Sequence, residues 1–149
     1  AQETLLDIPT IMALNNLDKL PFFITATCDF GTYDNPRRFS GSKAIMLNPK
    51  GGGIGLISAV RPVFTNTNYA LNLSFYNNLL SRNEEGQLND LGTVFKNTKN
   101  GSISRSNRAF SLIGDPSLVL NFPKYNVHID KIINGRDGQQ TDTLKALSI

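Results

Sequence analysis

Cysteine, histidine and charged residues are scarce in this 149-residue sequence, and each scarcity excludes a class of protein. A single cysteine cannot form an internal disulfide framework or a cysteine-based zinc site, and a single histidine argues against His-rich metal sites. Charged residues make up 18% of the chain, the formal net charge is +3, and Arg37-Arg38 is the only adjacent basic pair. This charge is too small for a nucleic-acid-binding face. No apolar run approaches the roughly eighteen residues of a membrane span.

Hydrophobic residues make up 40% of the chain, which is sufficient for the core of one globular domain. The sequence opens at Ala1 without an initiator Met and shows neither the charged nor the apolar region of a signal peptide. We therefore expect that a leader has been removed or that the sequence starts inside a longer protein. The stretch from Asp130 to Ile149 is polar and interrupted by Gly, so we interpret it as the start of a following segment.

Two continuous apolar runs predict buried strands over Phe22–Thr27 and Ile54–Val60. Such runs are typical of parallel strands covered by helices on both faces, and the crossover between these two is long enough to hold a helix. Further strands are predicted over Phe110–Gly114 and Leu118–Phe122. Helices are predicted to start at Asp7–Pro9, to cover Lys43–Asn48, to run from Thr65 or Asn66 to Leu80, and to run from about Leu88 to Gly101, with Tyr69, Leu73, Tyr76 and Leu80 sharing one apolar face. The order of these elements predicts an α/β layered domain.

Cys28 is the first candidate for chemistry, because it stands where the strand over Phe22–Thr27 stops. Catalytic groups of open α/β sheets lie at the carboxyl ends of strands, and a thiolate there is well placed for nucleophilic attack. The alternative is that Cys28 is a buried, inert packing residue. Asp29 and Phe30, its neighbours, are candidates for contacts with the substrate or the oxyanion. His128 lies in a strand-like stretch and is a poor candidate for the base.

The Gly-rich run Gly51-Gly52-Gly53-Ile54-Gly55 precedes a strand. A phosphate-binding loop instead follows a strand and opens a helix, so we interpret the run as a flexible turn followed by a strand glycine. A nucleotide-binding domain is therefore disfavoured, and we expect no cofactor and no metal. Asp34, Glu84 and Glu85 are interpreted as solvated loop charges.

The segment from Leu20 to Pro36, with Ala26-Thr27-Cys28-Asp29-Phe30 at its centre, resembles the nucleophile segment of the gingipain-like cysteine peptidases, peptidase family C25. Within that family it looks closest to the sortases of the type IX secretion system of Bacteroidetes. Three further stretches are similar in order and spacing: Leu47–Ile57, Thr65–Leu80 and Leu112–Leu118. The resemblance covers roughly residues 5 to 123.

This resemblance implies a caspase-like α/β fold with mainly parallel strands and a Cys-His dyad, in which Cys28 is the nucleophile. The family's histidine follows an earlier strand in a His-Gly motif, which this sequence lacks, and His128 lies on the wrong side of the cysteine to replace it. The resemblance therefore implies that residues 1–123 are the C-terminal part of a peptidase domain whose histidine lies before Ala1. Residues 124–149 would begin an immunoglobulin-like β segment.

The implied activity is that of a cysteine endopeptidase or transpeptidase that cleaves the C-terminal signal region of exported proteins through a thioester. The implied partners are these protein substrates and components of the secretion system, and the implied location is the outer face of the outer membrane. We expect the 149-residue chain to be inactive by itself. The alternative from another class is a non-catalytic surface or scaffold module. The two differ in one observable, since a catalytic Cys28 must be reachable beside a cleft.

Overall fold

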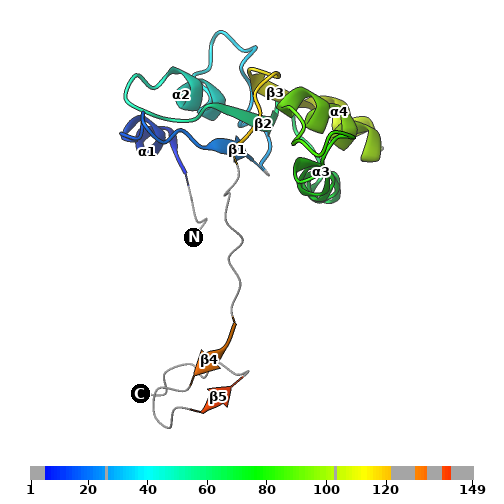
Figure 1. Ribbon diagram of the computed structural model, residues 1–149. Helices are drawn as coiled ribbons and strands as arrows, with labels where there is room; N and C mark the ends of the chain where they lie inside the picture. The colour runs from blue at the N-terminus through cyan, green and yellow to red at the C-terminus, as the bar shows by residue number, and fades with distance from the viewer. Residues whose placement is uncertain (1–5, 26, 103, 122–129, 134–138, 142–149) are drawn as a thin grey trace.

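A small mixed sheet with helices on both faces forms the centre of the molecule in the computed structural model, which describes residues 6–25, 27–102, 104–121, 130–133 and 139–141 (Figure 1). The sheet consists of β1 (Phe22–Ile24), β2 (Gly55–Ala59) and β3 (Phe110–Gly114), with β2 in the middle. The helices are α1 (Ile8–Met12), α2 (Gly41–Leu47), α3 (Thr65–Leu79) and α4 (Leu91–Gly101), followed by the short 3₁₀ helix η1 (Arg105–Ala109). The α/β class expected from the sequence is confirmed.

The side chains of β2 divide the core into two clusters, because successive residues of a strand point to opposite faces. Leu56 packs with Ile11 of α1 and Ile45 of α2, and all three are fully buried. Ile57 faces the other way, where the cluster comprises Ala59, Leu71, Phe75, Val94 and Phe110. All five residues of β2 are buried. The strand is thus covered by α1 and α2 on one face and by α3 and α4 on the other (Figure 1).

The pairing of β1 with β2 is parallel, as predicted, with Phe23 opposite Leu56. In contrast, β3 pairs antiparallel to β2, with Leu112 opposite Ile57. The reason lies in the connection between them. Helices α3 and α4 form an antiparallel hairpin, since Ser74 contacts Thr98 in the middle while the N-terminal part of α3 faces the C-terminal end of α4. The chain therefore returns to the carboxyl end of β2 and runs back along it.

Two predicted strands differ from the structure. The ladder of β1 ends at Ile24, three residues before the predicted end at Thr27, although the Thr25 N–H still donates to the Ile57 carbonyl at 3.0 Å. Residues 118–121 form no strand. The Leu118 carbonyl instead accepts from the N–H of Leu91 at 2.9 Å, so this segment satisfies a free donor at the start of α4.

The helix starts follow from their capping residues. Asp7 accepts from the Thr10 N–H at 2.8 Å, Ser40 caps α2 through the Lys43 N–H, and Asp90 accepts from the Thr93 N–H at 2.8 Å. The cap at Asp7 agrees with the helix start predicted at Asp7–Pro9, whereas the cap at Ser40 makes α2 begin at Gly41, before the predicted start at Lys43. The position of Asp90 explains why α4 begins at Leu91 and not near Leu88.

The Gly-rich run is a tightly held turn and not a flexible one. Gly52 has a φ of 97°, its N–H donates to the Asn16 side chain at 2.9 Å, and a Cβ on it would lie 2.1 Å from the Ile45 carbonyl oxygen. Only glycine fits this position.

In the C-terminal region the described residues form a short antiparallel pair, β4 (Ile132–Ile133) with β5 (Gln140–Thr141). The stretch that holds His128, like residues 134–138 and 142–149, lies outside the described residues. Among the described helices, none is both long and apolar enough to cross a membrane.

Candidate active site

Cys28 lies in the loop that leaves the carboxyl end of β1, four residues after the last strand residue, Ile24. Its side chain is exposed. The sulfur contacts the backbone of Val63 in the loop between β2 and α3: the thiol donates to the Val63 carbonyl at 3.2 Å, and the Val63 N–H reaches the sulfur at 3.5 Å. The thiol thus lies where two loops meet at the carboxyl ends of two parallel strands. Its exposure is inconsistent with a buried packing cysteine.

Asp29, directly after the thiol, has a φ of 59°, a conformation that side-chain-bearing residues rarely adopt. The turn is held from two sides. The Thr32 hydroxyl donates to the Asp29 carbonyl at 2.9 Å, and the Gly31 N–H donates to the Ala59 carbonyl at 3.0 Å. Because a Cβ at Gly31 would lie 2.8 Å from Ser58 Cβ, the loop is pressed directly against the end of β2. The left-handed residue turns the chain sharply and leaves the thiol on the outside of the bend.

Backbone N–H groups beside the thiol are available for an oxyanion. Within the described part of the chain, no group accepts a hydrogen bond from the N–H of Asp29 or of Phe30. The Phe30 side chain, by contrast, is half-buried and packs on the cluster around Ile45, with its ring against Gly41. Of the two predicted neighbours, Phe30 therefore anchors the loop with its side chain.

A hollow of about 480 Å³ opens beside Cys28 on the side of α1 and α2. Its walls come from the start of α1, the Cys28 loop and the segment before α2, and they are mainly apolar, with Ile8, Phe30 and Phe39 among them. Asp7, Asp29 and Arg38 are the charged residues of its lining. An extended peptide that passes the thiol can place one side chain in this hollow.

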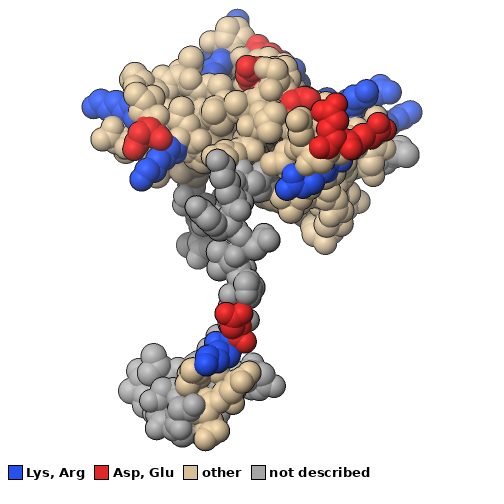
Figure 2. Space-filling model, viewed as in Figure 1, with Lys and Arg blue, Asp and Glu red and all other residues tan. Residues whose placement is uncertain are grey.

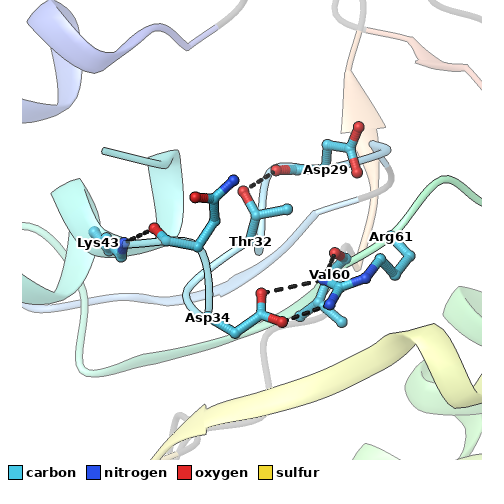
Figure 3. A network of polar contacts seen from close by, with 7 residues as sticks. Asp29, Thr32, Asp34, Lys43, Val60 and Arg61 are labelled. Atoms are coloured by element: carbon cyan, nitrogen blue, oxygen red, sulfur yellow. Dashed lines mark hydrogen bonds and ion pairs between the residues drawn. The ribbon is translucent and has the colours of Figure 1, made fainter. Parts of the chain in front are cut away.

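An ion pair ties the Cys28 loop to the end of β2 (Figure 3). Arg61 donates to both carboxylate oxygens of Asp34, at 3.1 and 2.5 Å, and to the Val60 carbonyl at 2.6 Å. These bonds from the Arg61 guanidinium lower the pKa of Asp34. The sequence had indicated only a solvated charge at Asp34. Its partner lies 27 positions away, and no local pattern signals that pairing.

Lys43 of α2 holds the same loop from its other end. Its ammonium group donates to the carbonyl of Asn35 at 2.6 Å, drawn as a dashed line in Figure 3. It also donates to the carbonyl of Arg38 at 2.9 Å. The loop between the thiol and α2 is therefore fixed by charged side chains on both of its flanks. Over the face seen in Figure 2, acidic and basic groups are interspersed and form no field of a single sign.

No described residue is a histidine, because His128, the sole histidine, lies outside the described residues. Within the described ranges no group of three or more His, Cys, Asp or Glu side chains is arranged to hold a metal ion. The described site thus consists of a thiol, candidate oxyanion donors and a substrate-sized hollow, without an acid-base partner.

In a comparison with known protein families, residues 1–121 match the model of peptidase family C25. No curated protein and no solved structure matches the chain. The matched range contains Cys28, both of its contacting loops and the whole three-stranded sheet.

Proposed function

Since the chain belongs to peptidase family C25, whose members are cysteine peptidases, we propose that Cys28 is its nucleophile. The exposed thiol at the outside of a left-handed bend, beside the hollow, is the observation that carries this proposal. A buried cysteine would have no path to a peptide carbonyl. Here the sulfur is exposed, and among the described residues its hydrogen bonds are with the backbone of Val63.

The reaction requires the Cys28 proton to leave before the sulfur attacks. The thiolate then forms a bond to the scissile carbonyl carbon, and the negative charge moves to the carbonyl oxygen. The N–H groups of Asp29 and Phe30 stabilise that oxyanion as hydrogen-bond donors. Collapse of the intermediate breaks the C–N bond, the leaving amine takes up the proton, and a thioester remains on Cys28. The base that carries the proton is a histidine that the described residues do not include.

The fate of the thioester separates two enzymes. Attack by water completes proteolysis, whereas attack by an amine transfers the acyl group, as in a sortase. We propose the second, in a PorU-like role: cleavage of the C-terminal signal region of exported proteins and transfer to an amine of a surface glycolipid, at the outer face of the outer membrane. The support for this role is the resemblance of the segments around Cys28 and Gly114-Asp115-Pro116-Ser117-Leu118 to type IX sortases.

The test compares Cys28→Ala with the wild type in a protein that contains the complete peptidase unit. We expect processing of exported cargo to stop while the melting temperature stays within about 1 °C, because removal of an exposed side chain opens no core volume. Cys28→Ser is the matched variant that keeps the size and hydrogen-bonding capacity of the side chain. Normal processing by a folded Cys28→Ala protein would exclude the catalytic role.

A second measurement concerns the 149-residue chain itself. We expect it to show no turnover of peptides, because the described residues around the thiol include no histidine that could act as its base. Iodoacetamide should nevertheless alkylate Cys28 in the native state, since the thiol is exposed. Turnover abolished by Cys28→Ala would contradict the expectation and would assign the role of the base to His128.

A further inference from the structure

The outer face of α3 is apolar and exposed. Four side chains form a line along it, which we call the α3 stripe: Tyr69, Leu73, Tyr76 and Leu80, with exposed fractions of 70%, 50%, 54% and 62%. From the sequence, these four residues were predicted to share one apolar face of the helix. In the structure the core is contacted by Asn68, Leu71 and Phe75, so α3 carries a second apolar face that no described residue covers.

The spacing of the stripe fits a partner helix. Its members are separated by four, three and four residues, which is the spacing of the seam between two packed helices. A helix of the length of α3 extends over roughly 22 Å, enough for three turns of contact. The described structure therefore presents one half of a helix–helix interface.

The lack of charged residues around the stripe limits the kind of partner that it can bind. From Pro62 to Leu80 the sequence contains no Asp, Glu, Lys or Arg. Helices that bind the surface of anionic membranes carry Lys or Arg beside their apolar face, which this segment lacks. A neutral surface is compatible with a copy of itself, because a two-fold contact places identical groups opposite each other without repulsion between like charges.

The order of side chains along the stripe is also self-complementary. It alternates Tyr, Leu, Tyr, Leu, so an antiparallel copy places Tyr69 opposite Leu80 and Leu73 opposite Tyr76. Every layer then pairs one large and one medium side chain, and the two helices can keep a constant separation. A parallel copy would instead alternate Tyr–Tyr with Leu–Leu layers. We propose that the α3 stripe is a homodimer interface in which two copies of this chain pair their α3 helices antiparallel.

The size of the interface sets its strength. Aromatic side chains bury about 150–250 Å² each, so the exposed parts of the stripe together supply on the order of 500 Å² per copy. Two copies bury about 1,000 Å², which is the lower limit for a specific interface. The dimer is therefore expected to be weak and reversible.

The test is sedimentation equilibrium of the 149-residue chain between about 10 µM and 1 mM. The expected result is a monomer–dimer equilibrium that Leu73→Glu and Tyr76→Glu each weaken by tenfold or more. Leu47→Glu is the matched control: Leu47 is 65% exposed but belongs to α2, so its substitution should leave the equilibrium unchanged. A monomeric wild type over the whole range, or equal weakening by Leu47→Glu, would overturn the proposal. So would binding of monomers to anionic vesicles through the stripe, since a lipid would then be the partner.

Orientation is tested by cross-linking in the Cys28→Ser background. Asn66 and Asn77 lie on the same flank of α3 and both are exposed. An antiparallel pair brings the two copies of residue 77 close to the two-fold axis and separates the two copies of residue 66 by more than about 20 Å. The two copies of residue 77 are still offset by roughly 8 Å along the helix axes, which is too far for a direct disulfide. A short bismaleimide reagent should therefore join two copies of Asn77→Cys and should not join two copies of Asn66→Cys. Equal cross-linking at both positions would contradict the antiparallel arrangement.

Discussion

Asp29 adopts the left-handed conformation directly after the candidate nucleophile, and its backbone has a measurable cost. A non-glycine residue in this region is strained by roughly 1–2 kcal/mol, and Asp tolerates it better than Ala because its side chain forms local hydrogen bonds. Strain of this kind gathers at functional sites, where surrounding contacts hold it in place. Here the holding contacts are the bonds of Thr32 and Gly31.

We expect Asp29→Gly to leave the free energy of unfolding unchanged or to raise it, and Asp29→Ala to lower it by about 1 kcal/mol relative to Asp29→Gly. Urea denaturation of both variants measures the difference. Equal stabilities for the two would mean that the bend costs nothing. If the bend relaxes in the Ala variant, the rate at which iodoacetamide alkylates Cys28 should change. In the Gly variant this rate should stay the same.

At the scale of the secondary-structure elements, α3 contains residues of the same type that differ in burial. Leu71 is fully buried and Leu73 is half exposed, although both are leucines of the same helix. We expect Leu71→Ala to destabilise by about 2–5 kcal/mol through the lost contacts and the cavity that remains. Leu73→Ala should change the stability by less than about 0.5 kcal/mol.

Thermal unfolding at low protein concentration, where self-association does not contribute, measures both variants of α3. Similar losses for the two would show that the stripe packs on the core in solution. Phe75→Ala, which removes a ring that stacks on Phe22 at 6.1 Å, should behave like Leu71→Ala and serves as a second buried reference.

The N-cap residue of α4, Asp90, makes the stability of the protein depend on pH. Hydrogen bonds from the Thr93 N–H and hydroxyl lower the pKa of Asp90 from its ordinary value of 3.8. The ionised carboxylate is thus favoured in the folded state, and its contribution is fully present above about pH 5. As the pH falls through 3.8 and then through the lower pKa of the folded protein, this contribution is lost.

Asp90→Ala should therefore cost about 1 kcal/mol at neutral pH and much less near pH 2, as a helix cap does. Asp90→Asn keeps an acceptor for the Thr93 N–H but cannot ionise, so its stability relative to the wild type should rise as the pH falls. Denaturation series at pH 7, 4 and 2.5 test this. A deficit of Asp90→Ala that does not change with pH would exclude the carboxylate as the cause.

How far the packing of a strand or helix can be predicted from the sequence depends on how many of its faces are apolar. The parallel pair β1–β2 was predicted because continuous apolar runs such as Ile54–Val60 have no polar face that could be exposed to solvent. A strand of this kind is stable only when both of its faces are buried. The shared apolar face of α3 was predicted from its spacing, but the helix has a second apolar face with Leu71 and Phe75, and periodicity does not show which of the two packs on the core. Within the site, Cys28 was found from its position after a strand. Its contact with Val63 was not, because it involves backbone atoms 35 positions apart.

On the scale of the whole molecule, the two faces of the sheet carry separate clusters that share one strand. Because Leu56 and Ile57 are adjacent in β2 and belong to different clusters, neither cluster can lose its packing without disturbing the other. We expect one cooperative unfolding transition. The loops at the carboxyl end of the sheet are joined separately, by the pair of Asp34 and Arg61.

Breaking this pair should affect the loop more than the fold. We expect Asp34→Asn to increase the rate of proteolytic cleavage between residues 31 and 39 several-fold, while the melting temperature changes little, because the pair is exposed. The reversed double variant Asp34→Arg/Arg61→Asp should restore part of the protection. Limited proteolysis followed by mass spectrometry measures both. Unchanged cleavage in Asp34→Asn would mean that Lys43 alone holds the loop.

The absence of charge along α3 determines how self-association of the protein responds to ionic strength. Raising the salt concentration screens the pair of Asp34 and Arg61 and loosens the loop that carries the thiol. The uncharged α3 stripe has nothing to screen, and a salting-out anion such as sulfate strengthens the burial of its Tyr and Leu side chains. Sulfate therefore has opposite effects on two surfaces of the molecule. It promotes self-association through the α3 stripe, and it weakens the ion pair of Asp34 and Arg61 in the loop that carries Cys28.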